Sequence, residues 1–113
     1  MSIITVAELA LWHRSDMAFS LLDVRRRQAR LADGNAIPGA EWFDPALWLD
    51  WKDRIPTDKP AVLYCVYGHE ISQGLAAALN AMGIDARHLV GGIEAWKAAE
   101  QPVYAVPNGW RQP

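Results

Sequence analysis

Cysteine is nearly absent from this chain, because only Cys65 among the 113 residues carries a thiol. A single cysteine excludes an internal disulfide and fits a reducing compartment, so we expect a cytoplasmic protein. Long apolar runs are also missing. The first residues, from Met1 to Glu8, lack the basic start and continuous apolar core of a signal peptide. The sequence therefore predicts neither a secretion signal nor a membrane span.

A strong charge of either sign is missing too. The net charge of −2 gives no reason to expect nucleic acid or an anionic membrane as a partner. The basic run Arg25–Arg27 with Arg30 is interpreted as a solvated helix face or loop and not as a nucleic-acid patch, because no other basic cluster extends it. His13 and His88 have no companions at metal-ligand spacing, so we predict no metal and no other cofactor. The oligomeric state is not indicated.

What the chain does contain is an alternation of short apolar runs with helical periodicity, which is typical of an α/β layer fold. The length suits one domain, predicted over residues 1–113 with a core of about 5–103 and an extended or loosely ordered tail over 104–113. Strands are predicted over 20–24, 41–43, 61–65 and 86–90. A short helix is predicted over 25–31, and further helices are predicted to follow Thr5, Asp44, Cys65 and the turn at Gly91-Gly92.

Two helix starts have side-chain caps in the sequence. Thr5 and Glu8 have the spacing of a capping box, and the helix behind them is predicted to bury Val6, Leu9, Leu11 and Trp12. Asp44 and Pro45 provide a cap and a proline at the first helical position, followed by apolar Leu47, Trp48 and Trp51. The helix after Cys65 has the clearest periodicity, with one apolar face predicted from Ile71, Leu75, Ala78, Leu79 and Met82.

Cys65 stands where the apolar strand over 61–65 runs into a loop and then a helix. A thiol at the carboxyl edge of a sheet faces the unpaired N–H groups and positive dipole end of the next helix, and both favour thiolate over thiol. Gly68 is the loop position at which a left-handed backbone costs least. The alternative is a buried and inert cysteine, since free cysteine is commonly buried.

Four motifs in sequence order resemble a rhodanese-type sulfurtransferase domain. They are Leu21–Arg25 (strand ending in Asp-Val-Arg), Gly34–Ala40 (Gly-Asn-Ala-Ile-Pro-Gly-Ala), the loop Cys65–Ser72, and Leu89–Trp96 (Leu-Val-Gly-Gly-Ile-Glu-Ala-Trp). The resemblance extends from about Thr5 to Val103. It implies a three-layer fold in which a parallel five-stranded sheet carries helices on both faces. It also implies that Cys65 accepts a sulfane sulfur from thiosulfate or a persulfide and passes it to a thiol, cyanide or protein acceptor.

The substrate-binding loop is predicted to comprise Val66, Tyr67, Gly68, His69, Glu70, Ile71 and Ser72. Family members usually have arginine where this chain has Glu70, and the serine that follows comes one place later, at Ser72. Glu70 should repel an anionic donor, or it caps the helix that starts here. His69 offers a partial positive charge or a hydrogen bond, and Tyr67 is interpreted as a packing residue that could line the site.

Asp23 and Arg25, at the end of a neighbouring strand, are interpreted as a link between loops. The alternative is that Arg25 adds positive potential near Cys65 and partly offsets the missing loop arginine. We predict a sulfurtransferase, with a weakly catalytic or non-catalytic sulfur carrier, redox sensor or interaction domain as the second hypothesis. A phosphatase or arsenate-reductase-like activity is disfavoured, because the residue six after Cys65 is Ile71 and the loop has no arginine.

Overall fold

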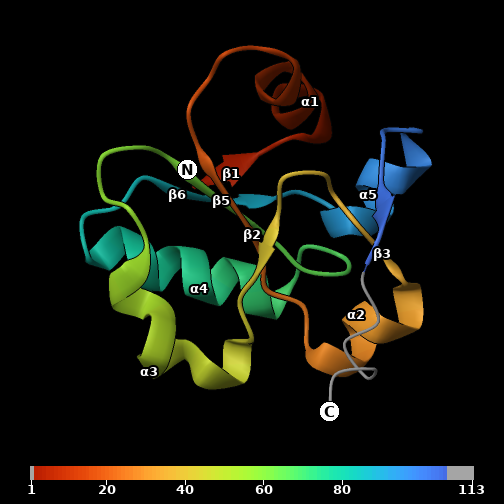
Figure 1. Cartoon of the computed structure of the whole chain (residues 1–113). Coiled ribbons are helices and arrows are strands. Elements are labelled where there is room, and N and C mark those ends of the chain that lie inside the picture. Colours follow the sequence, from red (N-terminus) through yellow and green to blue (C-terminus); the bar gives the residue numbers. More distant parts are fainter. Residues whose placement is uncertain (1, 107–113) are drawn as a thin grey trace.

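The computed structural model describes residues 2–106 and is built on a five-stranded parallel sheet in the order β1-β6-β5-β2-β4 (Figure 1). Its strands are β1 (Ile3–Ile4), β2 (Ser20–Asp23), β4 (Glu41–Trp42), β5 (Ala61–Tyr64) and β6 (Ala86–Leu89). A separate antiparallel pair joins β3 (Asn35–Ala36) to β7 (Tyr104–Ala105). The predicted α/β class and the five-stranded parallel sheet are therefore confirmed.

Helices cover both faces of the sheet (Figure 1). They are α1 (Val6–Arg14), α2 (Arg27–Asp33), α3 (Trp48–Trp51), α4 (Glu70–Ala81) and α5 (Gly92–Ala98), with 3-10 turns η1 (Pro45–Leu47) and η2 (Lys52–Arg54) beside α3. One core contains Leu9 of α1 and Trp96 of α5, and the other contains Trp51 of α3 and Leu79 of α4. The sheet therefore separates two apolar cores, which is the predicted three-layer arrangement.

Strand β5 lies at the centre of this arrangement, between β2 and β6. All four of its residues are buried, and they alternate between the cores: Leu63 packs with α4, whereas Val62 and Tyr64 pack with α1 and α5. A strand covered on both faces needs apolar residues at every position, which explains the uninterrupted run before Cys65. The central strand thus delivers Cys65 to the middle of the sheet's carboxyl edge.

Both predicted helix caps are present. Glu8 N–H donates to the Thr5 hydroxyl over 3.1 Å, and Thr5 N–H donates to Glu8 Oε1 over 2.9 Å, which completes the capping box. The Asp44 carboxylate accepts the Ala46 N–H over 3.0 Å, and Pro45 begins η1. These caps depend on neighbouring residues only, which is why a local pattern predicts them.

The predicted apolar faces are correct in their centres and wrong at their ends. On α1 the buried residues are Leu9 and Ala10, whereas Leu11 is 59% exposed. On α4 they are Ser72, Ala76 and Leu79, whereas Met82 is exposed; Leu47 is exposed as well. Met82 is the C-cap residue, just beyond the end of α4, whereas Leu79 in the last turn is completely buried.

Several elements differ from the sequence prediction. The edge strand β1 and the short strand β3 were not predicted, and the first residues of the predicted tail form β7, which pairs with β3. Helix α2 begins at Arg27 instead of Arg25, because Arg25 continues the extended chain after β2. The remainder of the predicted tail, residues 107–113, lies outside the described residues. Within residues 2–106 no helix combines the length and apolarity needed to cross a membrane.

Candidate active site

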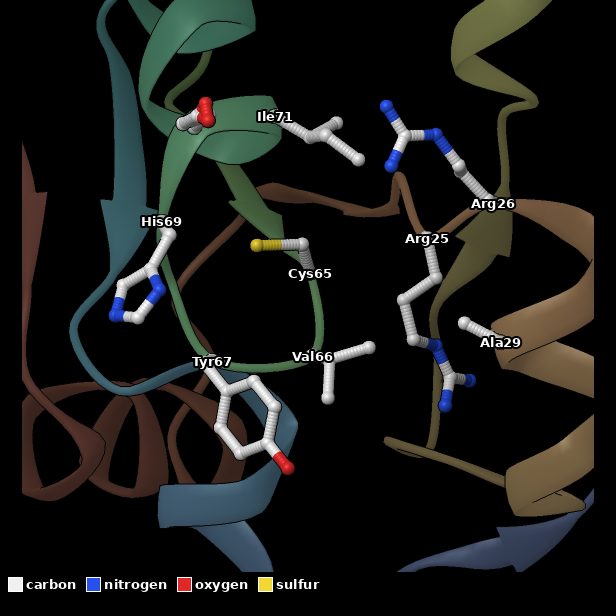
Figure 2. Close-up of a pocket in the computed structure, with 9 residues that line it drawn as sticks. Arg25, Arg26, Ala29, Cys65, Val66, Tyr67, His69 and Ile71 are labelled. Carbon is white, nitrogen blue, oxygen red and sulfur yellow. The ribbon is translucent and has the colours of Figure 1, made fainter.

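Cys65 lies directly after β5, and its side chain is only 6% exposed, yet it lines a cavity of about 370 Å³ (Figure 2). The loop that follows it curls around the sulfur and enters α4 at Glu70. The cavity is also lined by Arg25, Arg26, Ala29, Val66, Tyr67, His69, Glu70 and Ile71. The thiol is therefore buried by its own loop and open toward a pocket of substrate size.

Donors outside the loop hold its carbonyl groups. Ile93 N–H of α5 donates to the Cys65 carbonyl over 3.0 Å, and Glu94 N–H donates to the Val66 carbonyl over 3.1 Å. Further along, the Gln73 side-chain amide donates to the Gly68 carbonyl over 2.9 Å. The first turn of α5 and one side chain of α4 thus fix the path of the loop.

This arrangement leaves the loop N–H groups free. In a trans peptide the N–H of one residue points opposite to the carbonyl of the residue before it, so the Val66, Tyr67 and His69 amides point away from those donors. Within residues 2–106 no acceptor is bound by the backbone N–H of any residue from 66 to 69. Successive free amides are the donors of an anion-binding nest.

Two glycines allow the loop to dock on α5. Gly68 has φ +76°, and a Cβ at this position would lie 2.6 Å from the Leu89 carbonyl oxygen. Gly92 has φ +63°, and its Cβ would lie 2.5 Å from the Cys65 carbonyl oxygen. Both contacts are with backbone atoms, which cannot rotate away. The predicted left-handed position at Gly68 is confirmed, and the Gly91-Gly92 motif has a second use as the support of the Cys65 loop.

Ser72, in the first turn of α4, makes the direct polar contact with the thiol. Its hydroxyl oxygen lies 3.2 Å from Cys65 Sγ, and the residue is completely buried. When the sulfur is a thiolate, the hydroxyl is the donor of this bond, because the thiolate has no proton to give. Ser72 therefore contacts the sulfur, although it lies one position later in the loop than the serine that family members usually have.

The other loop side chains lie around the opening of the cavity (Figure 2). Tyr67 is 61% exposed, so its interpretation as a packing residue is wrong, and it lines the cavity, as the alternative interpretation stated. The centroid of its ring lies 6.2 Å from that of the His69 ring. Glu70 is the first residue of α4 and is exposed. Its carboxylate accepts no hydrogen bond within residues 2–106, so the dipole of α4 is its favourable interaction there.

Arg25 is not part of a solvated helix face, because it is 1% exposed. Its guanidinium donates to both Asp23 carboxylate oxygens, at 3.0 and 2.8 Å, to Asp33 at 2.8 Å and to the Asn35 carbonyl at 2.8 Å. Burial lowers the pKa of Arg25, but the hydrogen bond and charge of Asp23 outweigh it, so the pKa lies above its usual value. Figure 2 shows this guanidinium pointing away from the sulfur. Asp23 and Arg25 connect β2 to α2 and β3.

Arg26 is the pocket residue that the sequence analysis missed. It follows Arg25, lines the Cys65 cavity, and points across it toward Ile71 (Figure 2). The topology of the sheet could have indicated Arg26. Strands β2 and β5 are parallel neighbours, so the residues that follow them lie at the same edge of the sheet. Within residues 2–106, no cluster of three or more histidine, cysteine or acidic side chains could hold a metal ion.

Comparison with known proteins agrees with this geometry. The profile of the rhodanese-like domain matches residues 5–99. A probable adenylyltransferase/sulfurtransferase, MoeZ of Mycobacterium tuberculosis, is 38% identical over 103 residues, which are 89% of this chain and 26% of that protein. The chain thus spans about a quarter of the length of this relative.

Solved structures share the fold. A rhodanese-related protein from Thermoplasma volcanium superposes with a TM-score of 0.80 at 21% identity, covering 92% of this chain and 98% of that one. A thiosulfate sulfurtransferase from Pseudomonas aeruginosa gives 0.77 at 25% identity, covering 96% of this chain and 20% of that one. The chain belongs to the rhodanese-like domain family, whose relatives include sulfurtransferases.

Proposed function

We propose that this protein is a sulfurtransferase that carries sulfane sulfur as a persulfide on Cys65. The observation that carries the proposal is the loop itself. The Cys65, Val66 and Gly68 carbonyls accept hydrogen bonds from α4 and α5, the N–H groups of residues 66–69 bind no acceptor within residues 2–106, and Cys65 lines the cavity. Free amides around a sulfur stabilise the negative charge that it carries before and after the transfer. We assign the activity to the cytoplasm, where a lone cysteine remains reduced.

The reaction has two steps. The Cys65 thiolate attacks the terminal sulfur of a persulfide R–S–SH, the S–S bond of the donor breaks, and R–S⁻ leaves with the bonding electron pair. A thiophilic acceptor, such as a thiolate, cyanide or a protein thiol, then attacks the outer sulfur and releases the Cys65 thiolate. Because the chain has no second cysteine, no internal thiol attacks the persulfide, and the sulfur is transferred to an external acceptor.

Glu70 favours a persulfide over thiosulfate as the donor. Its carboxylate lines the same cavity as Cys65, so a donor with two negative charges next to its transferable sulfur meets a like charge. A persulfide brings less charge to the same place. The alternative function is that of a sulfur carrier with weak turnover. It rests on Glu70 too, because this residue replaces the arginine that family members usually have in the loop.

Turnover of thiosulfate and of a persulfide donor by the wild type, Cys65→Ser and Glu70→Arg tests the proposal. We expect Cys65→Ser to abolish turnover and Glu70→Arg to raise kcat/KM for thiosulfate by roughly tenfold, as expected when a repulsive charge becomes attractive in a partly solvated site. Asp50→Arg is the matched control, because it makes the same change in net charge on the exposed surface of α3.

Mass spectrometry separates the enzyme from the carrier. Wild-type protein treated with a persulfide donor should gain the mass of one sulfur atom, which cyanide removes. A stable mass gain without turnover would favour the carrier. If the protein gains no sulfur and Cys65→Ser matches the wild type in every assay, both sulfur functions are wrong.

A further inference from the structure

A second cavity adjoins the Cys65 cavity, and Arg26 and Ile71 line both. Its volume is about 510 Å³, compared with about 370 Å³ for the first. It is also lined by Arg27 and Gln28 at the start of α2 and by Asp44, Pro45 and Ala46 at the start of η1. We refer to the two cavities together as the Cys65 groove. Two adjoining cavities of these volumes have room for a molecule much larger than a persulfide group.

The positive charges of the groove are available for a ligand. Arg26 and Arg27 are exposed, and within residues 2–106 neither guanidinium forms an ion pair or a hydrogen bond. Arg25 is different, because Asp23, Asp33 and the Asn35 carbonyl occupy its guanidinium. Guanidinium groups bind carboxylates through paired, charge-assisted hydrogen bonds.

The acidic groups determine where an anionic ligand can place its charge. Glu70 lines only the Cys65 end, and it disfavours negative charge next to the reacting sulfur. In the second cavity the Asp44 carboxylate is engaged by the Ala46 N–H, and two arginines outnumber it. A ligand therefore fits best when its charge is several bonds away from its sulfur, beyond Arg26.

We propose that the Cys65 groove binds a low-molecular-weight thiol with a carboxylate several bonds from its sulfur, as in a short peptide thiol, with the carboxylate at Arg26 and Arg27. This assignment rests on the proposed sulfur transfer and names its substrate class. The persulfide R–S–SH of this thiol gives its outer sulfur to the Cys65 thiolate, and R–S⁻ leaves along the groove. The proton stays on the transferred sulfur.

The test compares two persulfide donors that differ in their tails. Glutathione persulfide carries carboxylates remote from its sulfur, whereas 2-mercaptoethanol persulfide is neutral outside the persulfide group. The quantity compared is the donor ratio, which is kcat/KM for glutathione persulfide divided by kcat/KM for the neutral donor. Arg27→Gln changes only the second cavity. We expect it to lower the donor ratio about three- to tenfold, mostly through a higher KM for glutathione persulfide. Arg26→Gln combined with Arg27→Gln should lower it further. Arg54→Gln, an exposed arginine of η2 outside the groove, should leave the ratio unchanged.

A binding experiment separates this inference from the proposed function. S-methylglutathione cannot donate sulfur, so calorimetric titration with it reports binding to the groove alone. We expect Arg27→Gln to weaken this binding by the same three- to tenfold factor. One outcome is that the wild type transfers sulfur from both donors with the same kcat/KM, and that Arg27→Gln leaves the ratio of the two kcat/KM values unchanged. In that case the groove assignment is wrong and the proposed function stands. If no donor is turned over while S-methylglutathione binds in an Arg27-dependent manner, the groove stands and the transfer is wrong.

Discussion

Replacing Gly92 by alanine should displace the Cys65 loop, because the new Cβ would meet the backbone that the loop uses to dock. That Cβ would lie 2.5 Å from the Cys65 carbonyl oxygen and even closer to the Val66 carbonyl oxygen. Neither atom can move without shifting the loop. The hydrogen bonds from Ile93 N–H and Glu94 N–H to these carbonyls would lengthen or break.

The cost has two parts that can be estimated separately. An alanine at φ +63° costs roughly 1–2 kcal/mol from backbone strain. Weakening two backbone hydrogen bonds costs about 0.5–1.5 kcal/mol each. The free energy of unfolding should therefore fall by about 2–5 kcal/mol, a large share of the 5–15 kcal/mol that is typical of a domain.

Chemical denaturation measures this loss, and Gly39→Ala is the matched control. Gly39 has φ +86° with no atom within 4 Å of an added Cβ, so this variant carries the strain without the contact. We expect Gly92→Ala to lose at least 1 kcal/mol more than Gly39→Ala. The rate at which a small alkylating agent modifies Cys65 should change only in Gly92→Ala. Equal losses in the two variants, with unchanged Cys65 reactivity, would refute the role of Gly92 as the support of the loop.

Two further perturbations test the scaffold. Arg25→Leu removes the guanidinium that binds both oxygens of the buried Asp23 carboxylate and leaves it only one ion pair, the longer one with Arg30 at 3.4 Å. This change should cost about 3–5 kcal/mol in urea denaturation, and a loss below about 1 kcal/mol would contradict the network. Burial lowers the pKa of His88 below 6.5 in the folded protein, so between these two pKa values the unfolded state binds more protons than the folded state. The free energy of unfolding should therefore fall as the pH drops below about 6.5, and it should become constant below the pKa of the folded state. His88→Gln should flatten this part of the stability profile, and an unchanged slope would show that His88 does not cause it.

Sequence reasoning placed Cys65 between the central strand and the next helix because the signals for these two elements are local. The continuous apolar run of β5 reflects burial on both faces, and the periodicity of α4 reflects a single packed face. Cys65 lies between these two patterns, so its place at the carboxyl edge followed without any knowledge of distant contacts. The beginning of α4 and the hydrogen bond from Ser72 depend on loop geometry and were not predictable in this way.

The missed features depend on residues far apart in the chain. Strand β1 has only two residues and is defined by pairing with β6, more than eighty positions later. The burial of Arg25 requires Asp33 and the Asn35 carbonyl, so a local run of arginines gave no sign of it. Arg26 could have been inferred only after β2 and β5 were known to be parallel neighbours.

The docking of the loop on α5 has a consequence for directed evolution of donor preference. Backbone atoms at positions 65, 66 and 68 are fixed by α5 and Gln73, so substitutions at Gly68, Gly91 or Gly92 should mostly yield library members with a displaced Cys65 loop. The side chains of Arg26, Tyr67 and Glu70 line the cavity, and none of them forms a hydrogen bond or an ion pair within residues 2–106. A library confined to those three positions can therefore sample new donors while it retains the fold.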